Sequence, residues 1–204
     1  MCIRDSTRTM LVEIIVDLLS KVISSLSWIG VFILMTLESA AIPIPSEIVV
    51  PMAGFALCNR VEEIAIGTII VSISNTAGSL LAYWIGKKYG KDFVKKYGKY
   101  ILLSSSKYER VEKLFLKYGS IIILTGRMMP AIRTFISLPA GLFRMNVHKF
   151  TLLTFLGSLP WNLIFLYIGY ILKENWKIIL LYSKYFDMIV LIGVLVSIYL
   201  IYRS

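Results

Sequence analysis

Charged residues divide this chain into uncharged stretches of different lengths. Residues 64–86 and 150–172 are 23 residues each, and a helix needs roughly 20 apolar residues to cross about 30 Å of hydrocarbon. Residues 188–202 are shorter, but flanking aromatic residues and Arg203 can anchor them at the interface, so a third span is predicted over 185–203. Four stretches are too short to span a membrane comfortably: 22–37, 48–59, 118–126 and 134–143.

The short stretches form two pairs, and proline separates the members of each pair. Pro43 and Pro45 lie in the first separator and Pro130 lies in the second. Proline removes a backbone donor and disfavours helix at the preceding residue, so we predict two re-entrant helical hairpins, over 28–58 and 119–143. Broken backbone at membrane depth is tolerated only where protein or water surrounds it. An ordinary surface loop between short spans stays open for the first pair, whereas the second pair is too short for it.

The chain before the first hairpin has the pattern of an amphipathic helix. Glu13, Asp17 and Lys21 are four residues apart and share one stripe, while apolar residues cover the rest. We therefore predict an interfacial amphipathic helix over 10–24. Residues 1–9 have no such pattern and are candidates for a non-native start. No small-residue cleavage site follows a short apolar core, so a removed signal peptide is not expected.

The order of these elements predicts an internal repeat. A hairpin followed by a span occurs at 28–58 and 64–86, and again at 119–143 and 150–172. Because one span separates the two units, the second is inverted relative to the first, as in many secondary transporters. The predicted fold is an all-α integral membrane protein with a single membrane domain, 1–204. It has two inverted-topology repeats, each a re-entrant helical hairpin followed by a transmembrane helix, plus a C-terminal transmembrane helix and an N-terminal amphipathic helix.

Composition and charge support this class and suggest an orientation. The chain is 57% hydrophobic and 17% charged, against roughly a quarter charged in soluble proteins, which excludes an ordinary cytosolic enzyme. The net charge is +10, and the basic segment 87–118 holds ten Lys and Arg against three Asp and Glu. The positive-inside rule places this segment in the cytoplasm. Anionic inner-leaflet lipids are its expected partner through 86–118, rather than nucleic acid.

Few residues are suited to metal or redox chemistry. Cys2 and Cys58 lie in unrelated settings, and His148 is the only histidine. Neither a disulfide framework nor a zinc site is predicted. We expect no metal site and no cofactor.

The two hairpin tips carry opposite charges. Glu38 and Glu47 flank the prolines of the first hairpin, whereas Arg127 and Arg133 flank Pro130. A charge at the bilayer centre costs from about 3 to more than about 10 kcal/mol. The four side chains are therefore expected to face one another or a wet cavity.

An arginine pair at membrane depth suits a phosphate head group, because the guanidinium fork matches phosphate oxygens. Arg127 and Arg133 are the candidate substrate-binding residues, and Glu38 and Glu47 are the candidate charge partners or proton carriers. Ion pairs that only join the hairpins remain the alternative. Asn75 is a candidate for lining the cavity, with helix packing as its alternative.

These residues, in their order and spacing, resemble the DedA family, also called SNARE-associated or VTT-domain proteins. The resemblance extends from about Trp28 to Trp176. It is carried by Glu38 with Pro43-Ile-Pro45-Ser-Glu47, by Gly78-Ser-Leu-Leu-Ala-Tyr83-Trp-Ile-Gly86, by Gly126-Arg127-Met-Met-Pro130-Ala-Ile-Arg133 and by Pro139-Ala140-Gly141. The functional positions of the family correspond to Glu38, Glu47, Arg127 and Arg133.

The resemblance implies lipid transport by a multi-pass protein of the bacterial cytoplasmic (inner) membrane. Bacterial members look like flippases that return undecaprenyl phosphate from the outer to the inner leaflet. We expect proton motive force to set the direction through Glu38. The Pro-Ser-Glu sequence ending at Glu47 is similar to that branch. Other members move phosphatidylethanolamine or act as phospholipid scramblases, so a general phospholipid translocase stays open. The implied protein is not an enzyme, and its oligomeric state is not implied.

Three other functions remain as alternatives. A membrane lipid phosphatase needs a nucleophile or general acid near the anion, and the only histidine is remote from the hairpin tips. A proton-coupled cation exporter would bind its ion at Glu38 and Glu47, although the arginines oppose a cation site. A scaffold would recruit partners through 86–118.

Overall fold

The computed structural model describes residues 3–42, 44–97, 105–128 and 130–172, and all regular structure in these ranges is helical. This confirms the all-α prediction for the described residues, whereas the predicted span 185–203 lies outside them. The helices are α1 (Ile3–Ser39), α2 (Ser46–Leu57), α3 (Val61–Tyr97), α4 (Ser105–Arg127), α5 (Pro130–Arg133), α6 (Ser137–Leu142) and α7 (Val147–Leu172).

Three segments of the described helices are long and apolar enough to cross a membrane: Asp17–Ser39, Val61–Gly90 and Val147–Leu172. The second and third contain the predicted spans 64–86 and 150–172. The first includes the stretch that the sequence assigned to a half-helix, together with part of the amphipathic helix that precedes it. Their length and composition indicate an integral membrane protein.

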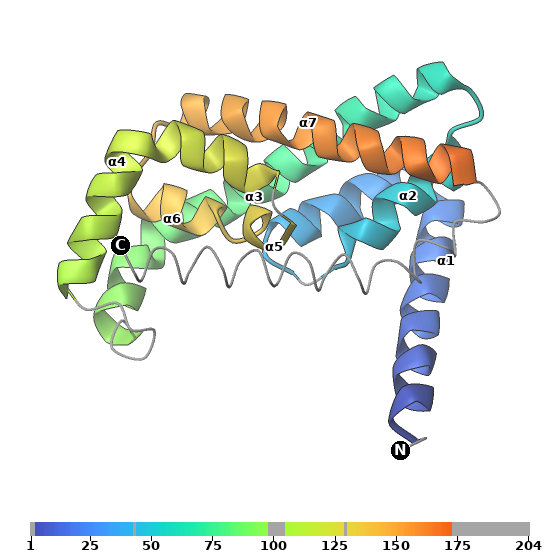
Figure 1. Cartoon of the computed structure of the whole chain (residues 1–204), viewed down its shortest axis with the longest axis horizontal. Helices are drawn as coiled ribbons and strands as arrows, with labels where there is room; N and C mark the ends of the chain where they lie inside the picture. Colours follow the sequence, from blue (N-terminus) through green and yellow to red (C-terminus); the bar gives the residue numbers. More distant parts are fainter. Residues whose placement is uncertain (1–2, 43, 98–104, 129, 173–204) are drawn as a thin grey trace.

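The helix α1 changes direction sharply at Ser27, where the backbone has φ 52° and ψ −136° (Figure 1). Positive φ is uncommon for a residue with a Cβ atom, and neither glycine nor proline occurs there to signal the break. Residues 10–24 lie in the part of α1 before this break. Within that part, Lys21 Nζ lies 2.7 Å from Asp17 Oδ2, with both side chains more than half exposed.

The long helices α3 and α7 run antiparallel, and the other helices pack on them (Figure 1). α1 and α6 pack on α3, while α4 and α2 pack on α7. Thus α3 packs on α1 from its own half of the chain and on the short helix α6 from the other half, and α7 packs in the same way on α4 and on the short helix α2. This arrangement brings the chain breaks after α1 and after α4 to the middle of the molecule.

Glycine allows α2 to approach α7 closely. A Cβ atom on Gly54 would overlap the backbone carbonyl of Leu166, and one on Gly169 would overlap the carbonyl of Pro51. In both helices the contacted residue lies three positions before the glycine: Pro51 before Gly54 in α2, and Leu166 before Gly169 in α7. Such small residues let membrane helices pack backbone against backbone.

The contact between α6 and α3 has the same form. A Cβ atom on Gly141 would overlap the carbonyl of Tyr83, and one on Gly86 would overlap the carbonyl of Leu138. Here too the contacted residue lies three positions before the glycine: Tyr83 before Gly86 in α3, and Leu138 before Gly141 in α6. The two short helices are therefore held on the two long ones in matching ways.

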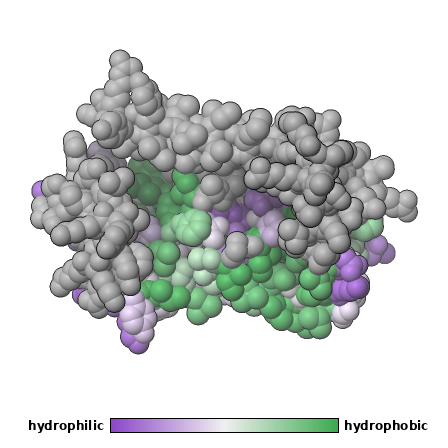
Figure 2. All heavy atoms as spheres, turned by 90° about the horizontal axis from the view of Figure 1, so that it is seen from below, coloured by the Kyte–Doolittle hydropathy of each residue, from purple (hydrophilic) through white to green (hydrophobic). Residues whose placement is uncertain are grey.

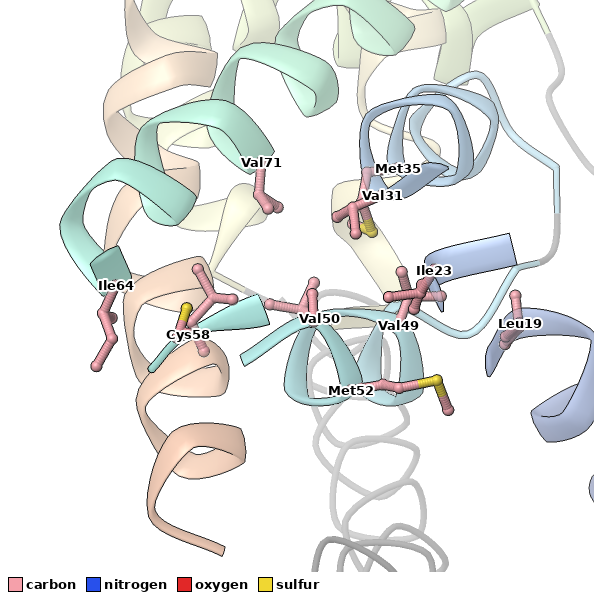
Figure 3. Close-up of a cluster of buried hydrophobic side chains, with 12 residues drawn as sticks. Leu19, Ile23, Val31, Met35, Val49, Val50, Met52, Cys58, Ile64 and Val71 are labelled. Atoms are coloured by element: carbon pink, nitrogen blue, oxygen red, sulfur yellow. The ribbon is translucent and has the colours of Figure 1, made fainter. Parts of the chain in front are cut away.

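Two clusters of buried apolar side chains fill the space between the helices. The first lies where α2 meets α1, α3 and α7, and Figure 3 shows side chains from these helices converging on it. Its labelled members in α1 and α2 include Ile23, Val31, Met35, Val49 and Val50. The second joins α3, α4, α6 and α7 and contains the Tyr83 and Phe150 rings, stacked with centroids 5.0 Å apart.

The outer surface is also apolar. Figure 2 shows hydrophobic side chains over much of the coloured surface on one face. Large exposed apolar side chains occur along α3 and α7, for example Ile69, Leu81, Leu156 and Leu163. Apolar areas of this extent mark a surface that faces lipid or a partner.

The Gly169 contact predicts a large effect of one methyl group. Gly169→Ala is expected to lower the free energy of unfolding by about 2–4 kcal/mol, because the added methyl meets backbone that cannot move aside. Gly119→Ala in α4 is the matched control, since its Cβ would meet only side-chain atoms, the nearest in Phe115 at 3.2 Å. Unfolding in detergent measures both variants. Equal stability of the two would contradict the close contact between α2 and α7.

Candidate functional site

The chain breaks place three charged side chains together in the interior. Glu38 lies at the end of α1, Arg127 ends α4 and Arg133 ends α5. Their exposed fractions are 4%, 3% and 4%. Pro45 directly precedes α2 and Pro130 begins α5. The helices therefore break near the predicted prolines, and each break lies beside a buried charge.

Both carboxylate oxygens of Glu38 have partners. The hydroxyl of Thr134 donates to Oε1 at 3.0 Å, and the hydroxyl of Ser39 donates to Oε2 at 3.0 Å. Arg133 Nη2 lies 3.2 Å from Oε2. This contact is an ion pair but not an aligned hydrogen bond, and Nη2 has no hydrogen-bond partner among the described residues.

Arg133 also contacts α7. Its Cζ atom lies 5.9 Å from the centre of a Trp161 ring, within the range of a cation–π interaction. Arg133 thus has two contacts: the ion pair with Glu38, which joins the second half of the chain to the first, and the Trp161 ring, which covers part of the guanidinium group.

Arg127 is held by hydroxyl groups. Its Nη2 donates to the Ser137 hydroxyl at 2.8 Å and also to the Ser79 hydroxyl. Ser79 in turn donates to the carbonyl of Asn75 at 2.6 Å, so its oxygen is left to accept. The Nε atom of Arg127 is buried without a hydrogen-bond partner in the described part of the chain. No carboxylate of those residues forms an ion pair with Arg127.

The charges of this site do not balance. Within the described residues, two buried guanidinium groups face one buried carboxylate. An uncompensated charge and an unpaired N–H group are both expensive in a dry interior. A phosphate would supply negative charge and several acceptor oxygens at once. The arrangement is therefore suited to binding an anion.

A chain of polar contacts leads from Glu38 into the interface between α3 and α7. The Ser39 hydroxyl also lies 3.3 Å from Asn75 Oδ1, and Asn75 Nδ2 donates to Asn162 Oδ1 at 3.3 Å. Asn162 Nδ2 donates to the Ser72 hydroxyl at 2.9 Å. All four of these side chains are at most 2% exposed. Asn75, a candidate for lining a cavity, thus lies in a buried network that touches the charged cluster.

Glu47 does not join the cluster. It lies in the first turn of α2 and is partly buried. Its carboxylate makes no hydrogen bond or ion pair with any described residue. The structure thus brings together three of the four predicted charged residues, and Pro43 lies outside the described residues.

The hydroxyl partners of the charges were not predicted as site residues. Ser79 belongs to a span rich in small polar residues, where packing is the ordinary role. Thr134 and Ser137 lie in an uncharged stretch whose pattern is apolar. The adjacency of Thr134 to Arg133 is the one sequence signal that could have pointed to it.

The chain is similar in sequence to several known proteins. The VTT domain matches residues 44–171, more than half of the chain. The chain is 37% identical over 153 residues to uncharacterized membrane protein YkoX of Bacillus subtilis strain 168, covering 75% of this chain and 67% of that protein. It is 39% identical over 137 residues to undecaprenyl phosphate transporter A of the same organism, covering 65% and 67%. An alkaline phosphatase-like protein of Lactococcus lactis subsp. lactis strain IL1403 is 33% identical over 169 residues, covering 80% and 78%. No solved structure matches significantly.

The buried ion pair is expected to be strongly coupled. Glu38→Ala and Arg133→Ala should each lower the free energy of unfolding by about 3–5 kcal/mol, because each leaves the other charge uncompensated. The double variant should lose less than the sum of the two, with a coupling energy of at least about 1 kcal/mol. A double-mutant cycle on the protein in detergent measures this coupling.

The exposed pair of Asp17 and Lys21 is the matched control for this cycle. These side chains are 61% and 70% exposed, so their coupling should stay below about 0.5 kcal/mol. If the coupling energy of Glu38 and Arg133 were no larger than that of the exposed pair, the result would contradict a buried ion pair between them.

Proposed function

The chain belongs to the VTT-domain family, also called the DedA family, and we propose that it transports a lipid with a phosphate head group across the membrane. The proposed substrate is undecaprenyl phosphate, after which a Bacillus subtilis relative is named. The observation that carries the proposal is the pair of buried arginines at the helix breaks, whose guanidinium groups outnumber the buried carboxylate beside them.

In this proposal the head group binds between Arg127 and Arg133 while the polyprenyl tail stays in lipid. Arg127 Nε and Arg133 Nη2 are buried donors without hydrogen-bond partners among the described residues, and phosphate oxygens accept such hydrogen bonds well. Binding would neutralise the positive excess of the site. The cost of bringing a phosphate to the middle of the bilayer would fall accordingly.

Glu38 would couple this binding to protons. When the head group takes over the contacts of Arg133, Glu38 loses its cationic partner, and a proton can replace it. The hydroxyls of Thr134 and Ser39 can hold the carboxyl group in either state. Proton motive force would then set the direction from the outer to the inner leaflet.

The helix packing supports an inverted repeat whose two halves move relative to each other during transport. The part of α1 after Ser27 and α2 would form the re-entrant hairpin 28–58, and the end of α4 with α5 and α6 the hairpin 119–143. Each hairpin leads into a long helix, and each short second helix packs on the long helix of the other half. Alternating exposure of a central site to the two leaflets is how such repeats work in other transporters.

The basic segment supports a cytoplasmic side at the end of α3. There Lys87 Nζ lies 4.6 Å from the centre of the Trp84 ring, and Lys88 Nζ lies 5.1 Å from that of Tyr89. Lys117 makes a similar contact with Tyr118 in α4. Aromatic and basic side chains together suit an interface with anionic lipid. We place the protein in the bacterial cytoplasmic membrane with 87–118 on the inner face.

The relative named as a transporter favours a transporter over an enzyme, although another relative is named alkaline phosphatase-like. His148, the chain's single histidine, is exposed in the first turn of α7. Within the described residues it makes no contact with the buried charges, so the arginine cluster has no histidine beside it to act as a general acid.

The arginines are expected to be essential for transport. Arg127→Ala and Arg133→Ala should each slow undecaprenyl phosphate movement in proteoliposomes at least about thirtyfold, because each removes a buried cationic partner of the phosphate. Arg60→Ala, in the exposed connector between α2 and α3, should leave the rate unchanged. Glu38→Gln should abolish the response to an imposed pH gradient.

Because Arg133→Ala leaves Glu38 unpaired, the neutral double variant Glu38→Gln with Arg133→Gln accompanies it, and circular dichroism checks that each variant is folded. Unchanged lipid movement in the arginine variants, with cation exchange lost in Glu38→Gln, would favour a cation exporter. Release of phosphate from the lipid would favour a phosphatase. Equal movement of phosphatidylethanolamine would favour a general phospholipid translocase.

A further inference from the structure

Thr154 differs from the other threonines in the helices. Among the helical threonines whose side chains are described, five others donate to the carbonyl four residues earlier, as is common for threonine in helices: Thr36, Thr68, Thr76, Thr125 and Thr151. Thr154 is 0% exposed, and its hydroxyl has no partner among the described residues. A buried hydroxyl left unpaired lowers stability, so this side chain carries a cost that its neighbours avoid.

The register of α3 against α7 places Thr154 beside the Arg127 site. Tyr83 stacks on Phe150, and Asn75 bonds to Asn162. In antiparallel helices, moving one turn from Tyr83 to Ser79 corresponds to moving one turn from Phe150 to Thr154. The Tyr83 contact places Thr154 level with Ser79, and the Asn75 contact places it within about one turn of Ser79, whose hydroxyl accepts a hydrogen bond from Arg127.

The contacts of Gly157 place Arg127 on the same stripe of α7. Thr154 and Gly157 both belong to the buried face of this helix and are three residues apart, which makes them neighbours on one face. A Cβ atom on Gly157 would lie 3.0 Å from the Cβ of Arg127. The Arg127 side chain thus leaves α4 next to Gly157 and reaches Ser79 on α3, at the level of Thr154.

Two unpaired buried donors therefore lie in one small region. Nη2 of Arg127 is already used by Ser79 and Ser137, whereas Nε has no partner among the described residues. Ser79 cannot donate to a ligand while its proton is bonded to the Asn75 carbonyl. The Thr154 hydroxyl has no such bond and is left to donate.

We propose that the Thr154 hydroxyl and the Nε–H of Arg127 together donate hydrogen bonds to the phosphate group of the ligand, which makes Thr154 a specificity-determining residue of the site. The proposal rests on the proposed function and deepens it by naming a second donor. Ser79 and Ser137 position the Arg127 guanidinium, and Thr154 completes the oxyanion subsite. A lipid phosphate and free inorganic phosphate share the chemistry that this subsite recognises.

The test compares two substitutions that separate the hydroxyl from the shape of the side chain. Thr154→Val keeps the shape and removes the hydroxyl, whereas Thr154→Ser keeps the hydroxyl. Binding of undecaprenyl phosphate to the full chain in detergent should weaken about ten- to a hundredfold in Thr154→Val, because a hydrogen bond to a charged group is lost. Thr154→Ser should bind within about threefold of wild type.

Thr151→Val is the matched control on the same helix, since the Thr151 hydroxyl donates to the carbonyl of Val147 at 2.8 Å. It should bind as wild type does. The melting temperature of ligand-free Thr154→Val should equal or exceed that of wild type, because the substitution removes an unpaired buried hydroxyl. If Thr154 served only packing, Thr154→Val would bind normally and Thr154→Ser would be the weaker and less stable variant, which would overturn the inference.

Three probes separate this inference from the proposed function. Undecaprenyl phosphate, inorganic phosphate and undecaprenol, which lacks the phosphate, are measured against each variant. If wild type binds undecaprenyl phosphate and Arg127→Ala does not, while Thr154→Val binds like wild type, the inference fails and the proposed function stands. Binding of inorganic phosphate alone, dependent on Thr154, would support the subsite and overturn the lipid substrate. Undecaprenol binding as tight as undecaprenyl phosphate, or no binding of either phosphate, would overturn both.

Discussion

The organisation of this molecule depends on holding two guanidinium groups and one carboxylate away from water. Glu38, Arg127 and Arg133 are each less than 5% exposed, although the surrounding chain is apolar and the outer surface suits lipid. Isolated charges are costly in such a place, so they need polar or oppositely charged partners. The hydroxyl partners Ser39, Thr134 and Ser137 lie at or near the helix breaks, whereas Ser79 lies within α3. The two helix breaks in the middle of the molecule therefore supply most of the polar partners of the buried charges.

Close helix packing makes the short polar partners sufficient. Serine and asparagine side chains reach only a few ångströms, so α3 and α7 must lie near each other for Asn75 to meet Asn162 at 3.3 Å. Gly54, Gly169, Gly86 and Gly141 bring the short helices against the long ones. Gly157 does the same for Arg127, whose Cβ would lie 3.0 Å from an added Cβ. The small residues thus support the charged cluster, because they let the helices approach closely enough for short polar side chains to form hydrogen bonds.

The sequence predicted the residues of the charged cluster that interrupt apolar stretches. Charges inside apolar stretches identified Glu38, Arg127 and Arg133, and the prolines located the breaks near Pro45 and Pro130. The hydroxyl partners stayed hidden because serine and threonine are common in membrane helices for packing alone. Glu47 has the same residue type as Glu38 and flanks the same prolines from the other side, yet it makes no contact with the arginines among the described residues. Which of two acids turns inward depends on helix direction, and the turn at Ser27, which sets the direction of α1, has no glycine or proline signal.

The two halves of the chain also resemble each other in detail, except that the buried side chain at the corresponding position is acidic in one half and basic in the other. Thr36 and Thr125 each donate to the carbonyl four residues earlier, at the ends of α1 and α4. Two residues after each threonine comes a buried charge, Glu38 in the first half and Arg127 in the second. Gly78 packs under the first end and Gly157 under the second. If the halves are an inverted repeat, corresponding positions then hold an acid and a base, and an exchange of conformations between the halves would move opposite charges in opposite directions. Arg133 has no counterpart of this kind, because the described residues of the first half contain no buried charge other than Glu38. The positive excess of the site therefore comes from the difference between the halves, and a symmetric repeat alone could not bind an anion.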